Sequence, residues 1–194
     1  MLRAVWVASF CLVLLLISGC RQSPPSFNSV DITGAQGYGT DFRLTDHTGK
    51  PRTMADFRGK VVAIFFGFTF CPDVCPTTLS EMRQVLQQLG PDSKKLQVLF
   101  ITVDPKRDTP ELLARYVSSF NPTFLGLYGD EAATAKVTKD FKIISRVVAG
   151  KTADTYTVDH TAGILFFDTQ GRLRLMAPYG LPADKLAADI EKLF

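Results

Sequence analysis

The part of the sequence best suited to chemistry is a short segment with two cysteines, Cys71 and Cys75, in the run GFTFCPDVCPTT. Three residues separate the cysteines, so both sulfurs approach one point if the loop coils. Such a pair either closes a disulfide bond or chelates a soft metal, and it cannot do both at once. The segment therefore predicts a redox-gated binding site, with a purely structural disulfide as the alternative.

Two thiolates rarely complete a metal site, and the chain offers only two histidines as a third ligand. His47 lies in a polar turn and is expected to be solvated. His160 lies just before an apolar run, in the sequence VDHT. Thiolates and imidazole suit copper, as Cu(I) or Cu(II), with three-coordinate Cu(I) the softest match, although zinc accepts the same ligands. The alternative is that His160 is an ordinary hydrogen-bonded loop residue.

Several acidic residues are candidates for supporting the ligands. Asp73, between the cysteines, either tunes the thiols or hydrogen-bonds the loop N–H groups. Asp104 follows the second apolar strand and is a candidate for supporting a ligand through a hydrogen bond. Asp159 either orients the neighbouring imidazole or forms a turn. Asp108 or Thr109 is expected to cap the helix that follows.

Strands and helices alternate along the chain, and this order places the cysteines. The apolar run Lys60–Phe66 predicts a buried strand, and helical spacing follows over 76–89. The remaining expected elements are a strand and turn over 41–51, strands at 96–103, 124–127, 142–148, 163–167 and 173–176, and helices at 109–120, 131–141 and 181–194. The sequence thus predicts an α/β protein with a central mixed sheet flanked by helices.

The element order resembles a thioredoxin-like fold with an extra N-terminal strand or hairpin. The cysteine segment then leaves the carboxyl end of a central strand, where open α/β folds bind ligands. Cys75 is expected at a helix N-terminus, where free N–H groups favour a thiolate. Thioredoxins place a cis-proline in the loop that faces their cysteines, but no proline occurs from 152 to 169. His160, a potential metal ligand, stands there instead.

The composition is that of a globular protein, and the N-terminus predicts export. The chain has 194 residues, 46% hydrophobic and 21% charged, with a net charge of +3, which gives no reason to expect nucleic-acid binding. An apolar run over 4–17 is followed by Ser18-Gly19-Cys20, which matches a lipoprotein signal. We expect a signal peptide over 1–19, lipidation of Cys20, a flexible tether over 20–40 and one domain over 41–194. The predicted location is the membrane, facing the periplasm or cell exterior. The alternatives are an ordinary secretory leader or a short uncleaved anchor.

Three motifs together resemble the Sco/SenC family: GFTFCPDVCPTTL from Gly67, VDPKRDTP from Val103 and VDHT from Val158. The resemblance extends from about residue 42 to the C-terminus. It implies a membrane-tethered, thioredoxin-like copper protein that helps to build the binuclear copper site of cytochrome c oxidase. The family's ligands fall on Cys71, Cys75 and His160. One departure is Phe70, where several relatives carry a histidine. The lipoprotein leader also departs from the family's common transmembrane anchor.

The resemblance implies three partners: the copper-site subunit of the oxidase, a periplasmic thiol reductant and another copper carrier. A metallochaperone is favoured over an enzyme. The alternative is a thiol–disulfide oxidoreductase that keeps the oxidase cysteines reduced, which would need Cys71 and Cys75 but not His160. A thiol peroxidase is disfavoured, because the threonine expected three residues before a reactive cysteine is replaced by Phe68 or Pro72.

Overall fold

The structure is a computed structural model that describes residues 26–152 and 155–194. The expected signal peptide, the lipidation residue Cys20 and the start of the expected tether lie outside the described residues. Within the described ranges, none of the helices has both the length and the hydropathy that a membrane crossing requires.

Eight strands form one mixed sheet. In spatial order they are β1 (Val30–Asp31), β10 (Leu173–Ala177), β9 (Ile164–Phe167), β4 (Val61–Gly67), β5 (Leu96–Thr102), β6 (Leu125–Tyr128), β2 (Leu44–Asp46) and β3 (Pro51–Arg52). The central strands β4, β5 and β6 run parallel, and β9 runs antiparallel to β4. The β2–β3 hairpin at the edge matches the predicted extra N-terminal element.

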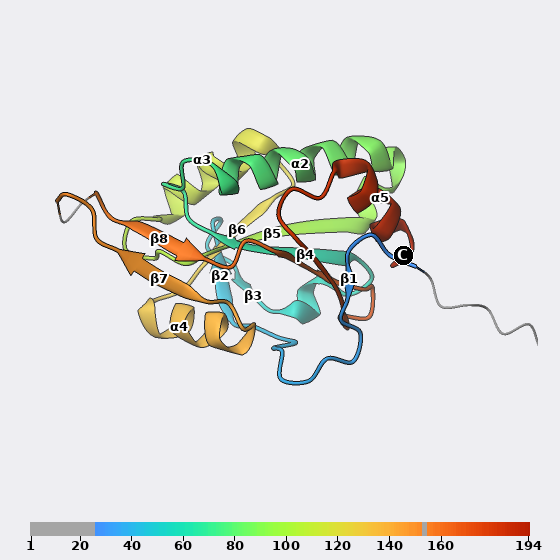
Figure 1. Ribbon diagram of the computed structural model, residues 1–194, viewed down its shortest axis with the longest axis horizontal. Helices are drawn as coiled ribbons and strands as arrows, with labels where there is room; N and C mark the ends of the chain where they lie inside the picture. Colours follow the sequence, from blue (N-terminus) through green and yellow to red (C-terminus); the bar gives the residue numbers. More distant parts are fainter. Residues whose placement is uncertain (1–25, 153–154) are drawn as a thin grey trace, which may run out of the picture.

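Helices cover both faces of this sheet, as Figure 1 shows. Helices α2 (Val74–Leu89), α3 (Pro110–Phe120) and α5 (Ala183–Glu191) lie on one face, and α4 (Glu131–Asp140) lies on the other. Two short 3₁₀ helices, η1 (Met54–Phe57) and η2 (Gly90–Lys95), connect the elements. Side chains alternate along a strand, so Phe65 of β4 packs into the core under α2 while Phe66 packs into the opposite core. Both cores consist of buried apolar side chains, which explains the uninterrupted apolar run of β4.

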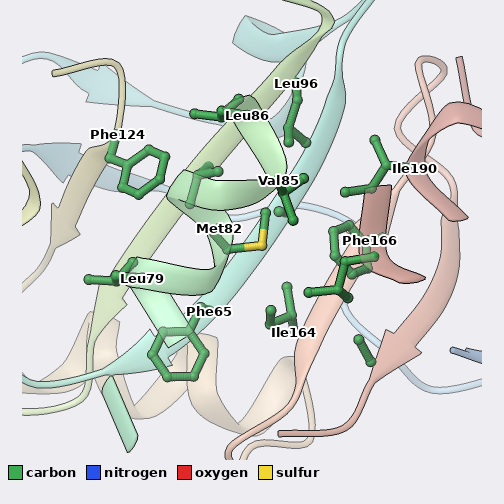
Figure 2. Packing of buried hydrophobic residues seen from close by; sticks show 14 of the residues in the cluster. Phe65, Leu79, Met82, Val85, Leu86, Leu96, Phe124, Ile164, Phe166 and Ile190 are labelled. Carbon is green, nitrogen blue, oxygen red and sulfur yellow. The ribbon is translucent and has the colours of Figure 1, made fainter. Parts of the chain in front are cut away.

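Helix α2 is held over the sheet by an apolar stripe at helical spacing. Figure 2 shows Met82 and Val85 directed from α2 toward Ile164 and Phe166 of the sheet, beside Ile190 of α5. All five side chains are almost completely buried. This packing fixes the N-terminal end of α2 beside the carboxyl end of β4.

A second, two-stranded sheet lies beside the main one. Strands β7 (Ser145–Val148) and β8 (Thr157–His160) pair antiparallel, with Ser145 opposite His160 (Figure 1). The sequence predicted β7 within 142–148 but did not predict β8. Only Val158 of β8 is apolar and buried, so the strand carries no pattern that distinguishes it from a loop.

The described part of the expected tether contacts the domain. Val30 in β1 pairs with Met176 in β10. The backbone N–H groups of Asn28 and Ser29 donate to the carboxylate of Asp189 in α5, at 2.9 and 2.7 Å. Residues 28–32 therefore lie against the sheet edge and α5, ahead of residue 41 where we expected the domain to begin.

Candidate metal centre

The fold brings the cysteine loop and the segment of His160 to the same edge of the sheet. The parallel strands β4 and β5 end there, with Gly67 opposite Thr102. Strand β9 runs the other way and begins at this edge, where Ile164 pairs with Phe65. The residues just before β9 therefore face the loop that follows β4.

Three potential ligand atoms meet at this edge. The sulfurs of Cys71 and Cys75 and an imidazole nitrogen of His160 all lie within 4.8 Å of one another. The Cys75 Sγ is 3.6 Å from the His160 Nε2. Both cysteines are free thiols. The three residues that the sequence singled out are thus gathered at one point.

The loop between the cysteines coils back on itself. The Cys71 N–H donates to the carbonyl oxygen of Phe68 at 3.2 Å, and the Cys75 N–H donates to the Cys71 Sγ at 3.5 Å. Helix α2 begins at Val74, so Pro76 lies in its first turn as predicted. A free N–H at the start of the helix therefore serves the sulfur of Cys71.

Cys75 itself differs from the sequence-based expectation. We expected the helix N-terminus to favour its thiolate, but the side chain is completely buried. Burial raises the pKa of the Cys75 thiol strongly, and a hydrogen bond with the backbone of Phe68 opposes this only in part. The expectation is corrected: the raised pKa favours the protonated thiol of Cys75 in the metal-free protein.

Gly67 makes room for the buried sulfur. A Cβ atom at this position would lie 2.8 Å from the Cys75 Sγ and 2.7 Å from the Cε2 of Phe100. Carbon atoms do not approach neighbours that closely, so a larger residue would displace Cys75 or the ring. The last residue of β4 is therefore constrained by the site that follows it.

The imidazole of His160 is oriented by the backbone of the next residue, Thr161. Its Nδ1 lies 3.0 Å from the carbonyl oxygen of Thr161. A carbonyl oxygen only accepts, so Nδ1 carries the proton and Nε2 presents its lone pair toward Cys75. Burial lowers the pKa of His160, against the opposing effects of the Thr161 hydrogen bond and the charge of Asp159. The ring is therefore neutral at neutral pH, as a metal ligand must be.

Aromatic rings frame the imidazole. Phe65 and Phe68 meet it edge to face, with ring centroids 6.1 and 6.0 Å away. Both are buried, whereas Phe70 is 55% exposed at the rim. A hollow of about 340 Å³ opens the site to solvent between Cys71, Pro72, Asp73, Asp159 and His160. The site is lined by buried aromatic rings on its inner side and is open on one outer side.

Two of the acidic candidates lie at this opening. Asp73 is exposed at the start of α2, and its carboxylate accepts a long hydrogen bond from the Thr77 hydroxyl at 3.5 Å. The Asp159 side chain is 63% exposed and pairs with Arg146 at 3.3 Å. Neither carboxylate is hydrogen-bonded to a thiol or to the imidazole within the part of the chain that the structure describes.

The other acidic residues, Asp104 and Asp108, are buried behind the site. Asp104 accepts hydrogen bonds from the Nε of Arg107 and the hydroxyl of Tyr156, at 2.5 and 2.8 Å. Asp108 accepts hydrogen bonds from the backbone and hydroxyl of Thr69, at the start of the cysteine loop, and from the hydroxyl of Thr102. Asp108 thus anchors the loop, whereas Thr109, the other candidate, caps α3 by accepting from the Leu112 N–H at 3.2 Å.

Sequence reasoning misplaced one residue and missed others. His47 was expected to be solvated, but it is half-buried, and its Nδ1 accepts a hydrogen bond from the Gly126 N–H at 3.1 Å. Arg107, Tyr156 and Thr69 received no role from the sequence. Apart from the Arg107–Asp104 pair, which is three residues apart, their contacts join residues 39 to 52 positions apart, so no local pattern could have revealed those contacts.

Comparison with known proteins identifies the family. The family model described as SCO1/SenC matches residues 30–194. The mitochondrial SCO2 homolog of Bos taurus is 43% identical over 133 residues, which cover 68% of this chain and 50% of the relative. That of Homo sapiens is 42% identical over 143 residues, covering 69% and 54%. The chain spans about half the length of these curated relatives.

Solved structures of similar proteins point to the same family. Copper-bound ScoI of Bradyrhizobium japonicum is 43% identical with a TM-score of 0.75, over 81% of this chain and 99% of that one. Copper-bound yeast Sco1 is 32% identical with a TM-score of 0.72, over 80% and 87%. These matches confirm the thioredoxin-like α/β class that the element order suggested. Since the family model covers most of the chain and the cysteine and histidine motifs converge in space, the chain belongs to the SCO1/SenC family.

Proposed function

We propose that this protein binds copper between Cys71, Cys75 and His160 and delivers it to the copper-site subunit of cytochrome c oxidase. The observation that carries the proposal is the convergence of two thiols and a neutral imidazole within 4.8 Å. Soft sulfur ligands with one imidazole suit Cu(I). Zinc usually takes four ligands in a closed site, and only three gather here among the described residues. Copper is bound in similar proteins from Bradyrhizobium japonicum and yeast.

Delivery requires a site that gives copper up as well as one that holds it. The hollow beside Cys71 and His160 leaves these two of the three ligands accessible from one side. A cysteine of the acceptor can enter there as a fourth ligand before one of the original ligands leaves. The opening thus favours ligand exchange over permanent storage, and another copper carrier can load the site by the same route in reverse.

The thiol pair makes copper binding depend on its redox state. Oxidation joins the two sulfurs in a disulfide and removes two ligands. Restoring the site takes two electrons and two protons from a dithiol reductant, which itself becomes a disulfide. In an exported protein such a reductant is required before copper can be loaded.

A second candidate function rests on the unequal exposure of the two thiols. Cys71 is partly exposed and Cys75 is completely buried. An accessible thiol with a buried partner can exchange disulfides, so the protein could instead keep the acceptor's copper-binding cysteines reduced. This activity would need Cys71 and Cys75 but would not need the imidazole of His160.

The experiment that separates the two functions uses a soluble acceptor domain with its own copper-site cysteines. In the first assay, copper-loaded protein is mixed anaerobically with the reduced acceptor, and copper transfer is measured. In the second, metal-free reduced protein is mixed with the oxidised acceptor, and reduction of the acceptor disulfide is measured. Both assays use the wild type and His160→Ala. If the protein delivers copper, His160→Ala should transfer much less copper than the wild type but should still reduce the acceptor disulfide. Equal copper transfer by both proteins would overturn the assignment of His160, and transfer by neither, with reduction intact, would favour the oxidoreductase.

The membrane attachment is a separate proposal. The apolar run over 4–17 followed by Gly19-Cys20 supports export and lipidation of Cys20, which would hold the domain at the membrane surface, facing the periplasm or cell exterior. Labelling of the full-length chain with radioactive palmitate should mark the wild type and spare Cys20→Ser. Label retained in Cys20→Ser would refute lipidation at this residue.

A further inference from the structure

Arg107 occupies an unusual position beside the proposed copper site. Its Nε donates to Asp104 at 2.5 Å, and its Nη1 donates to the carbonyl oxygen of Tyr156 at 2.8 Å. The guanidinium carbon lies only 3.5 Å from the centre of the Tyr156 ring, which is stacking distance. Tyr156 closes the arrangement by donating its hydroxyl proton to Asp104 at 2.8 Å.

These contacts tie down the strand that carries His160. Tyr156 immediately precedes β8, and His160 is the last residue of that strand. Strand β8 pairs with β7 alone and takes no part in the eight-stranded sheet. It therefore lacks the backbone pairing that fixes the strands of the main sheet, so contacts such as those of Arg107 position it.

Arg107 also contacts the segment that carries the cysteines. The guanidinium carbon lies 4.9 Å from the ring centre of Phe70 and 5.7 Å from that of Phe68. Phe70 directly precedes Cys71, and Phe68 packs edge to face against the His160 imidazole. One side chain thus touches both halves of the site, the cysteine loop and the beginning of the histidine strand.

We infer that Arg107 is a positioning residue that sets the separation between His160 and the two cysteine sulfurs. This inference rests on the proposed copper binding. Arg107 is not one of the three proposed ligands; it holds β8 against the cysteine loop, so that the ligands need little further ordering when copper binds. Its Nη2 is buried without a hydrogen-bond acceptor among the described residues. Burying an unpaired donor lowers the stability of the fold, so stability alone does not explain why Arg107 is held here.

The test is a double-mutant cycle read out as Cu(I) affinity of the reduced protein, measured by competition with a chromogenic chelator. The variants are Arg107→Leu, His160→Ala and the double variant. Arg107→Leu should weaken copper binding by about tenfold or more, as loss of an outer partner of a metal ligand commonly does. In the His160→Ala background the same substitution should cause no further loss.

Two milder variants keep the test decisive if Arg107→Leu does not fold. Arg107→Lys keeps the charge but loses the flat face and the paired donors, so it should resemble Arg107→Leu in affinity. Tyr156→Phe removes only the hydroxyl that binds Asp104 and should weaken copper binding by a smaller factor in the same direction. Wild-type affinity in Arg107→Lys would overturn the inference.

Arg52 provides a matched control on a remote edge strand. Its Nε donates to the buried Asp46 at 2.7 Å, and its guanidinium lies 5.8 Å from the Phe57 ring centre. Its side chain is 24% exposed, compared with 16% for Arg107. Arg52→Leu should lower the free energy of unfolding and leave copper affinity unchanged.

The outcomes separate the inference from the function on which it rests. If His160→Ala weakens copper binding and Arg107→Leu does not, Arg107 does not position the ligand and the copper site stands. If Arg107→Leu weakens binding equally with and without His160, it acts on something other than His160 and the inference is refuted. If His160→Ala leaves affinity unchanged, the proposed copper site itself is wrong.

Discussion

At the scale of single residues, the site combines two ligands in contrasting states. Burial raises the pKa of the Cys75 thiol, which favours its protonated form. Burial also lowers the pKa of the His160 imidazole, which favours its neutral form. The same desolvation therefore prepares one ligand for metal binding and makes the other depend on losing a proton. Copper must displace the proton of Cys75 when it binds.

Copper affinity should consequently rise with pH. Competition titrations of the reduced protein between about pH 6 and pH 8 should show about tenfold tighter binding per pH unit for each proton displaced. Cys75→Ser should bind more weakly and with a shallower pH dependence. An affinity of the wild type that does not change with pH would show that Cys75 is already a thiolate.

The ligands could be predicted from the sequence, but their support could not. Cys71, Cys75 and His160 are rare residue types in recognisable motifs. The contacts of Arg107 and Tyr156 depend on which strands become neighbours, and 49 residues separate these two. Asp108 resembled a helix cap by position, yet the fold brings Thr69 and Thr102 to its carboxylate.

At the scale of elements, β4 and α2 together form the base of the site. The seven residues of β4 are completely buried, and α2 begins directly after the cysteine loop. Both elements were predicted closely, because an apolar run and a 3.6-residue period are strong signals. Strand β8 was not, since its position is set by β7 and by contacts with Arg107 rather than by its own pattern.

The second prediction concerns Gly67, at the junction of β4 and the cysteine loop that leads into α2. Gly67→Ala places a methyl group against the Cys75 sulfur and the Phe100 ring, so it should cost roughly 1–3 kcal/mol of unfolding free energy and weaken copper binding. Denaturant unfolding and chelator competition measure the two effects.

Gly126→Ala is the control, because its new methyl group would crowd Leu113 at 3.1 Å, in the core between β6 and α3. It should also lower the free energy of unfolding but leave copper affinity unchanged. Equal losses of copper affinity in both variants would show that Gly67 matters only for stability.

At the scale of the whole molecule, buried carboxylates secure turns and ends of the fold outside the copper site. Asp46 holds the β2–β3 turn, Asp168 holds the β9–β10 turn, and Asp189 holds the N-terminal segment against α5. Each has a pKa below its ordinary value, because hydrogen bonds outweigh the opposing effect of burial.

Acid should therefore destabilise the protein through these groups. Burial alone would raise the pKa of Asp46, but hydrogen bonds from Thr48, Arg52 and Lys50 bring it from 3.8 to about 2. A lowered pKa in the folded state contributes stability above the ordinary value, and this is lost as the pH falls toward 2. The contribution is about 2 kcal/mol. Urea unfolding of Asp46→Asn should show lower stability at neutral pH and a flatter decline below about pH 4; an unchanged decline would contradict this.

The most direct test of copper binding at Cys71, Cys75 and His160 is X-ray absorption spectroscopy of the reduced protein loaded with one equivalent of Cu(I). The wild type should show two sulfur ligands and one imidazole nitrogen, and His160→Ala should lose the nitrogen and keep both sulfurs. A wild-type copper centre without a nitrogen ligand, or one that His160→Ala leaves unchanged, would contradict the proposed site.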